Sequence, residues 1–456
     1  MDYVKTGNGS IPWISLLAIL SISLTVNLPG LAVSPILAKL QEIFPHSTQL
    51  ETQMLTSLPN LVIIPFILLS GKFAKGKRQI YVLGLGLIIF TLAGVLYFFA
   101  KSMMVLILLG CLIGIGCGLV IPLAASMIAI YFTGRRDVWA LGLKSGTSNA
   151  AVIVATLFVG WVAAYNWHLS FLVYLVPVIP LLLIPFMTPG YISSHFRDDP
   201  TAPNPSPAAL AAREAASAGK RKGFPLPDGS KKHIISLLLS VIALYILCTY
   251  ATIAVSYSLP FTMGHYGFSS GTVGIATSMF FLSATCAGFT LPYMMKICKG
   301  ATIFVSLLIS IVGLLMVAFL HLLPTYLIGV FLTGYGYGII QPIIYDKTTS
   351  IAPNKSLANA YFSYVLTGNY IAISCAPFFL KGMEALFNGV GGAGPNFSFI
   401  LNACVLALVF IAGIFLRKAY VFRINPDNYG GKHKKVDSKI PSPAPTPTTP
   451  IHKIHA

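Results

Sequence analysis

Long apolar stretches, separated by short polar segments, dominate the hydrophobic pattern of this chain. Twelve of them are long enough to cross a bilayer, since a spanning helix needs about 20 apolar residues. They cover 12–38, 53–71, 80–100, 103–131, 143–164, 169–189, 234–259, 270–294, 301–322, 325–350, 357–381 and 396–416. The first is too long for the apolar region of a cleavable signal peptide, so we interpret it as the first span. The pattern predicts an all-α membrane protein with twelve transmembrane helices.

One glycine-rich motif occurs twice, deep inside spans 4 and 10. Both copies have the spacing Gly-x-Gly-x-Gly-x-x-x-Pro, and they consist of Gly114, Gly116, Gly118 and Pro122 in the first and Gly334, Gly336, Gly338 and Pro342 in the second. Small residues at this spacing let helix backbones approach closely, and a proline is tolerated where neighbouring helices satisfy the freed carbonyl. Either copy alone would be explained by ordinary packing between helices. The matched pair predicts two pseudo-symmetric six-helix bundles, an arrangement found in secondary transporters.

The composition agrees with a protein that lies mainly in lipid. Hydrophobic residues make up 56% of the chain and charged residues only 9%, whereas ordinary soluble domains carry about 25% charged residues. We expect four parts, which are a six-helix bundle at 1–190, a cytoplasmic central linker at 191–233, a second six-helix bundle at 234–418, and a basic, proline-rich cytoplasmic tail at 419–456.

The net charge of +18 lies in short loops and in the two longer polar segments. It does not form a basic face with interleaved aromatics, so we expect no nucleic-acid partner. A cytoplasmic amino terminus places 27 of the 30 Lys and Arg residues inside and leaves only Lys39, Lys101 and Lys381 outside. The positive-inside rule therefore predicts a multi-pass plasma-membrane protein with both termini cytoplasmic. The seven cysteines lack Cys-x-x-Cys spacing, so neither a disulfide framework nor a metal site is indicated, and we expect no cofactor.

The loop between spans 2 and 3 reads Gly-Lys-Phe-Ala-Lys-Gly-Lys-Arg over residues 71–78. Nearly the whole chain resembles the major facilitator superfamily. The resemblance rests on this loop together with the two six-span halves, the basic central loop and the repeated motif. Members of that superfamily carry Gly-x-x-x-Asp-x-x-Gly-Arg-Arg in this loop, whereas here the segment is shorter and Lys75 stands at the acidic position. The general sequence pattern, without a specific motif, is also similar to that of conjugated bile-salt permeases of Gram-positive gut bacteria. The resemblance implies that spans 1, 4, 7 and 10 line a central cavity.

Polar side chains form stripes on these spans. Tyr245, Thr249, Thr252 and Ser256 share one face of span 7, and span 10 repeats the pattern from Tyr337. The substrate-contact candidates are Asn27, Asn60, Tyr245, Thr249, Tyr337, Gln341, Tyr345, Tyr364 and Asn369. Such residues also form hydrogen bonds that hold neighbouring helices together, each worth about 0.6 kcal/mol. The sequence allows both roles, substrate contact and interhelical bonding.

Ionisable residues inside the spans are scarce, because a charge at the bilayer centre costs about 2.5–3.5 kcal/mol on insertion scales. Lys144 begins span 5, with Ser148 and Asn149 one turn further on. It either reaches the membrane interface or meets an anionic group of the substrate. Asp346, in the last turns of span 10, belongs either to a cytoplasmic gate or a helix-end pairing, or to a coupling proton site. We assign gating and packing roles to the motif glycines and prolines and to Lys75, Arg78 and Asp346.

No acidic residue falls at the middle of a span, which favours an anionic over a cationic substrate. The leading hypothesis is transport of an amphipathic organic anion, such as a conjugated bile salt, by alternating access. We expect a monomer in the lipid bilayer that works by symport or antiport, with a proton as the candidate coupling ion. A multidrug exporter is the alternative of the same fold, although lipophilic cations favour a buried carboxylate.

A membrane channel or receptor is the alternative of another class. The internal repeat, without a selectivity-filter-like loop, speaks against a channel. The sequence has no nucleotide-binding glycine loop, no His-Glu-x-x-His run and no serine nucleophile elbow, so we expect no enzyme.

Overall fold

The computed structural model describes residues 3–6, 9–73, 78–132, 135–198, 231–351, 355–388, 394–417 and 419–423. Eleven segments of this part of the chain are long and apolar enough to cross a membrane. One of them, Ser270–Phe319, has 50 residues, and as a single helix it would be about 75 Å long, more than twice the thickness of the hydrocarbon core. A turn at Lys299, where φ is 47°, divides it into two helices, α13 and α14. The twelve predicted crossings are therefore confirmed.

The first half contains six crossings, of which the second to fifth are each essentially one helix. These are α4 (Gln49–Phe73), α5 (Arg78–Leu96, extended by the 3-10 turn η3, Tyr97–Phe99), α6 (Met103–Tyr131) and α7 (Arg135–Val162). The first and sixth crossings are broken by prolines. They consist of α1 (Trp13–Ser21), η1 (Ile22–Leu24), α2 (Leu28–Leu31), η2 (Ser34–Ile36) and α3 (Leu37–Ile43), and of α8 (Trp167–Ser170), η4 (Phe171–Leu175), α9 (Val178–Leu183) and η5 (Ile184–Met187).

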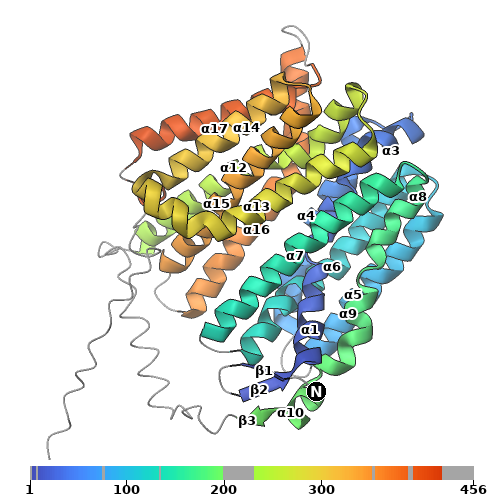
Figure 1. The fold of residues 1–456 in the computed structure, drawn as a ribbon, viewed down its shortest axis with the longest axis vertical. Coiled ribbons are helices and arrows are strands. Elements are labelled where there is room, and N and C mark those ends of the chain that lie inside the picture. The colour runs from blue at the N-terminus through green and yellow to red at the C-terminus, as the bar shows by residue number, and fades with distance from the viewer. Residues whose placement is uncertain are drawn as a thin grey trace, which may run out of the picture.

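In the second half each crossing is one continuous helix. They are α12 (Lys231–His265), α13 (Ser270–Cys298), α14 (Thr302–Phe319, after η6, Lys299–Ala301), α15 (Leu323–Ile351), α16 (Lys355–Asn388) and α17 (Phe397–Phe415). Figure 1 shows the two halves side by side, the first in blue to green and the second in yellow to red. Each half has its own buried core of apolar side chains.

The repeated glycine motif makes equivalent contacts in the two halves. An added Cβ at Gly114 or Gly118 would collide with the α4 backbone, and one at Gly116 would lie 2.6 Å from the Gly86 carbonyl oxygen of α5. In the second half, Gly334 and Gly338 face α13, whereas Gly336 faces α14. The first and third glycines thus pack on span 2 or 8, and the middle glycine packs on span 3 or 9. Span 4 and span 10 therefore hold corresponding positions in two related bundles.

The break in the first crossing exposes backbone carbonyls that other spans satisfy. Ser148 of α7 donates to the Ser23 carbonyl at 2.9 Å, and Tyr174 donates to the Pro29 carbonyl at 3.2 Å. The thiol of Cys117 lies 3.6 Å from the carbonyl oxygens of both Thr25 and Val26. Irregular backbone is tolerated at membrane depth only when it is satisfied in this way within the protein.

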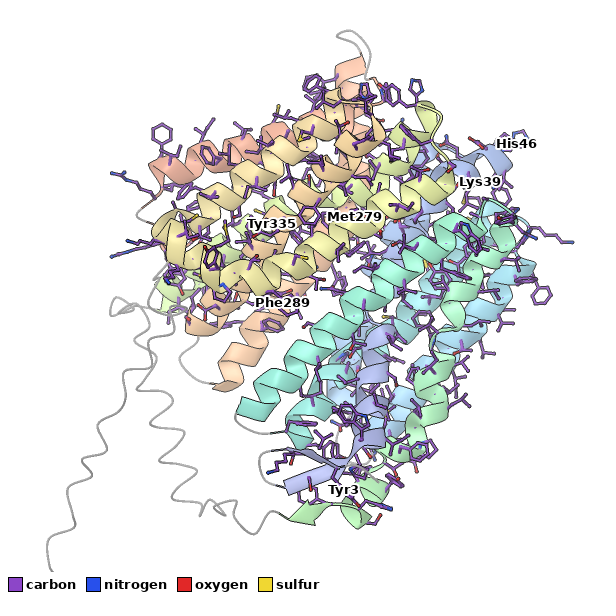
Figure 2. All side chains as sticks on the ribbon, in the orientation of Figure 1. Tyr3, Lys39, His46, Met279, Phe289 and Tyr335 are labelled. Carbon is purple, nitrogen blue, oxygen red and sulfur yellow. The ribbon has the colours of Figure 1, made fainter. Side chains whose placement is uncertain are left out.

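The two halves touch near one end of the bundle. Gly160 of α7 and Gly274 of α13 cross so closely that a Cβ at either would lie 2.6 Å from a backbone oxygen of the other helix. Within the first half, Lys39, at the end of the first crossing, donates to the Ala163 carbonyl just beyond Gly160. Gln53 of α4 donates to the Tyr257 carbonyl of α12 at 3.2 Å. We call this end, where Lys39 and His46 lie in Figure 2, the closed end.

The halves separate toward the opposite end, where Tyr3 lies in Figure 2. Gly146 of α7 and Gly288 of α13 have no neighbouring atom within 4 Å of an added Cβ, and Figure 1 shows these two helices diverging. A small antiparallel sheet of β1 (Tyr3–Lys5), β2 (Gly9–Pro12) and β3 (Arg197–Asp198) lies at this end. It joins the amino-terminal segment to Arg197–Asp198 of the predicted linker, whose first residues, from 191, belong to α10 (Pro189–Ser194). Residues 199–230 of that linker lie outside the described residues, and its last three, 231–233, form the start of the next helix.

Candidate functional site

Six of the predicted substrate-contact residues form one hydrogen-bonded network inside the second half. Tyr245 and Thr249 come from α12, Asn369 comes from α16, and Tyr337, Gln341 and Tyr345 come from α15. The Tyr245 ring is nearly parallel to the Tyr337 ring, with centroids 6.5 Å apart. It stands at 80° to the Tyr345 ring, with centroids 5.8 Å apart. Tyr245 and Thr249 on α12, and Tyr337, Gln341 and Tyr345 on α15, are spaced four residues apart. On each helix they therefore lie on one face, one turn apart.

The Tyr245 hydroxyl is the centre of this network. It lies 3.0 Å from the Tyr345 hydroxyl, and it accepts a hydrogen bond from the Gln341 side-chain amide at 3.1 Å. The same Gln341 amide donates to the Tyr345 hydroxyl at 2.9 Å. With Thr249 and Asn369, the network therefore consists of phenol, amide and threonine hydroxyl groups and contains no carboxylate.

Thr249 and Asn369 extend the network to α16. The Thr249 hydroxyl donates to Asn369 Oδ1 at 2.9 Å, and the Tyr337 hydroxyl lies 3.3 Å from Thr249 Oγ1 and 3.4 Å from Asn369 Oδ1. Tyrosines that offer a flat apolar ring and a hydroxyl suit an amphipathic ligand. The same contacts also bind three helices together, so the network has a structural role in this state.

Removing one hydroxyl tests that structural role. Tyr245→Phe should lower the free energy of unfolding by about 1 kcal/mol, because it leaves the half-buried Gln341 donor with one acceptor fewer. Tyr364→Phe is the matched control, since it removes a tyrosine hydroxyl from the same half outside the network. Thermal unfolding of both variants in the same detergent measures the difference. Equal stability of the two would contradict a structural role for the Tyr245 hydroxyl.

Tyr364 does not join the network. Its side chain is 58% exposed, and it shares the outward face of α16 with Ile371 and Phe378, each seven residues further on and also exposed. This seven-residue spacing marks the lipid-facing stripe of α16. Tyr364 therefore faces away from the residues with which it was grouped.

Tyr370 and Cys117 are the residues that sequence reasoning missed. Tyr370 belongs to α16 of the second half but packs against the core of the first. It lies in the neighbourhood of Cys117, Tyr337 and Tyr345. Tyr370 is thus placed between the network and span 4, where Cys117 stands between the motif glycines. Its position next to Asn369 in the sequence was the available signal.

The predicted residues of the first half lie apart from this network. Asn60 is buried, donates to the Thr56 carbonyl of its own helix at 2.8 Å, and packs against Gly30. Ser148 is held by the Ser23 carbonyl. Asn27, directly before α2, and Asn149 are half-buried. The structure therefore places Asn60 and Ser148 as contacts that support the broken first crossing.

Lys144 is half-buried on α7. No hydrogen bond or ion pair of its ammonium group occurs with the described part of the chain. It lies on the half of α7 that includes Gly142 and Gly146, whose surroundings are open. Lys144 therefore lies near the separated end of the two halves.

The gating candidates have different surroundings. Lys75 lies outside the described residues, and Arg78 is exposed at the start of α5. Asp346 is half-buried beside Lys347, whose buried ammonium donates to the Tyr420 and Arg423 carbonyls at 2.6 and 2.7 Å. This part of α15 holds the segment that follows α17. The role of Asp346 itself stays a prediction.

Comparison with known proteins identifies the family of this chain. The family model described as Major Facilitator Superfamily matches residues 14–377. The chain belongs to the major facilitator superfamily. Superfamily members are membrane transporters that bind small-molecule substrates, which agrees with the twelve crossings and their internal repeat.

Solved structures of other superfamily members share this fold at low sequence identity. A bacterial homologue of the human lysosomal transporter Spinster, in an inward-facing and unoccupied conformation, has a TM-score of 0.63 and 16% identity, with 90% of this chain and 98% of that chain covered. A D-xylose-proton symporter has a TM-score of 0.65 and 14% identity, with coverage of 90% and 97%. At such identities the likeness concerns the fold alone.

One curated relative is similar over a shorter region. Multidrug transporter protein MdtP of Bacillus subtilis (strain 168) is 33% identical over 131 residues. The match covers 28% of this chain and 23% of the relative. The similarity therefore extends over less than a third of either protein.

Proposed function

We propose that this superfamily member carries an amphipathic organic anion across the plasma membrane by alternating access, with conjugated bile salts as one candidate class. The observation that carries the proposal is the network around Tyr245, which offers aromatic rings, hydroxyls and amides without a carboxylate. The half-buried Lys144 would supply a cation for the anionic group. Such a site suits a ligand with a broad apolar surface and one negative group.

The arrangement of the halves supports alternating access. The α7–α13 contact at Gly160 and Gly274 closes one end of the bundle, whereas Gly146 and Gly288 of the same helices have no neighbour. In secondary transporters, rocking of one repeat against the other exposes a central site to each side in turn. We propose that the closed end faces outward, since the distribution of Lys and Arg predicts cytoplasmic termini.

A panel of ligands tests the substrate class directly. Purified protein should show a higher melting temperature with taurine-conjugated bile salts than with uncharged sterol glycosides or lipophilic cations, because a ligand that binds only the folded form stabilises it. Uptake into proteoliposomes, with and without an imposed pH gradient, then tests transport and proton coupling. Stabilisation by cations alone would refute the proposed anion specificity.

Lys144 gives a sharper test of charge recognition. Lys144→Gln should weaken uptake of anionic substrates by about tenfold and change uptake of neutral analogues little, since a charge-assisted contact contributes about 1.5–3 kcal/mol. The measurement is the ratio of initial rates for a matched charged and uncharged substrate pair. Lys144→Arg is the conservative control and should retain anion uptake. An equal loss for both substrates would remove Lys144 as the charge partner.

Multidrug export is a second candidate function, which the similarity to the Bacillus subtilis multidrug transporter favours. It shares the fold and the aromatic network but predicts a different substrate range. Expression in a drug-sensitive host distinguishes the two, because an exporter raises resistance to several unrelated lipophilic compounds. A bile-anion carrier would change sensitivity to bile salts alone.

A further inference from the structure

A separate pocket lies at the closed end of the first half, outside the network around Tyr245. Its volume is about 750 Å³, within the range of about 300–1,000 Å³ that is common for small-molecule sites. It is formed by the loop that follows α3, by the start of α4 and by the start of α6. His46, which lines it, marks its place in Figure 2. We call it the closed-end pocket.

The closed-end pocket is amphipathic. Its floor is apolar and includes Met54 and Leu58 of α4 and Ile107 of α6. Its rim is polar and includes His46 and Lys101. A ligand that fits both surfaces has an apolar chain and a polar end.

The pocket is continuous with the surface of the protein that faces lipid. Met104 and Leu108 of α6 line it, and their side chains are 68% and 60% exposed. They precede the span-4 motif on a helix that crosses the membrane, so these exposed apolar groups contact acyl chains. A lipid can therefore enter the pocket sideways from the adjacent leaflet, without crossing water.

The rim carries one cation, Lys101, and one carboxylate, Glu51, and of the two only the cation has no hydrogen-bond partner among the described residues. Lys101 is exposed, and its ammonium group has no hydrogen bond or ion pair with the residues that the structure describes. The carboxylate of Glu51 on the same rim already accepts a hydrogen bond from the Thr48 backbone amide at 2.7 Å and caps α4. Lysine at the end of a span also lies at the depth of lipid headgroups.

We propose that the closed-end pocket binds one anionic phospholipid, with an acyl chain between α4 and α6 and the headgroup phosphate at Lys101. The surrounding bilayer supplies this ligand, and no other part of the described chain fills the space. The site is independent of the transported substrate, since its residues do not contribute to the network around Tyr245.

Cys111 provides a direct readout, because it lines the pocket and is a half-buried free thiol. In full-length protein whose other six cysteines are replaced by serine or alanine, N-ethylmaleimide should modify Cys111 in detergent. Added phosphatidylglycerol should slow this reaction at least about fivefold. Phosphatidylcholine should slow it less, and glycerol 3-phosphate, which has the phosphate without an acyl chain, should not slow it. Equal protection by both phospholipids, or protection by neither, would overturn the proposal.

A charge-removal pair tests the role of Lys101 separately. In native mass spectrometry of the full chain, Lys101→Gln should lower retention of phosphatidylglycerol by about threefold to fivefold, as expected for one exposed charge contact. Lys381→Gln is the matched control, since Lys381 is also exposed at a span end but pairs with Glu384 at 3.3 Å. It should leave retention unchanged. The same loss in both variants would show a general surface attraction and overturn the assigned site.

Discussion

Gly160→Leu should abolish transport while leaving a folded protein. The Cβ of the added side chain would lie 2.6 Å from the Ser270 carbonyl oxygen and 2.9 Å from the Gly274 Cα. Both are backbone atoms, so α13 would have to move to make room. The cost of such overpacking, about 1–3 kcal/mol or more, applies only when the closed end is shut. The equilibrium should therefore shift by about tenfold or more toward conformations in which that end is open.

Cysteine labelling measures this shift. Gln53 is buried and bonds across the halves to the Tyr257 carbonyl, so Gln53→Cys should react slowly with a membrane-impermeant maleimide in the parent protein. Added Gly160→Leu should speed this reaction about tenfold. Gly146→Leu is the control, because it lies on the same helix and has no neighbour within 4 Å. Unchanged labelling and full transport by Gly160→Leu would show that the contact is not part of the transport cycle.

Gly116→Ala and Gly336→Ala should both destabilise the protein, and by similar amounts. An alanine Cβ at 116 would lie 2.6 Å from the Gly86 oxygen and 2.8 Å from the Phe90 nitrogen, and one at 336 would collide with the Ser306 carbonyl and the Ser310 side chain. In each case a span must move away from its neighbour, so we expect a loss of about 1–3 kcal/mol. The melting temperature of purified protein is the measurement.

The control for this pair is Gly288→Ala, where no atom lies within 4 Å of the new Cβ. It should be neutral or stabilising by up to about 1 kcal/mol, because alanine favours helix over glycine. A large loss at 116 with none at 336 would contradict the equivalence of the two motifs. A loss at 288 as large as at the motif positions would show that the cost arises from helix propensity or local exposure instead of from packing.

Much of the second-half network was predictable, because its geometry is local to each helix. Tyr337, Gln341 and Tyr345 are four residues apart, and so are Tyr245 and Thr249, which puts each set on one face regardless of the surrounding fold. That the two faces meet was implied by the resemblance to the major facilitator superfamily, in which spans 7 and 10 line the central cavity. The choice between Tyr364 and Tyr370 on α16 was not predictable in the same way, since both are tyrosines in one apolar run. Which of them faces inward depends on how α16 is rotated against α12 and α4.

The sequence by itself determined the twelve crossings, the duplication and the matched positions of the two motifs, because the thickness of the bilayer and the need for close backbone contact act on local stretches of chain. Only the tertiary structure decided that the first crossing is broken, that Ser148 and Cys117 serve its freed carbonyls, and that Gly160 meets Gly274 at the closed end. These features depend on which helix faces touch, and such contacts join residues that lie far apart along the chain and leave no periodic trace in either segment.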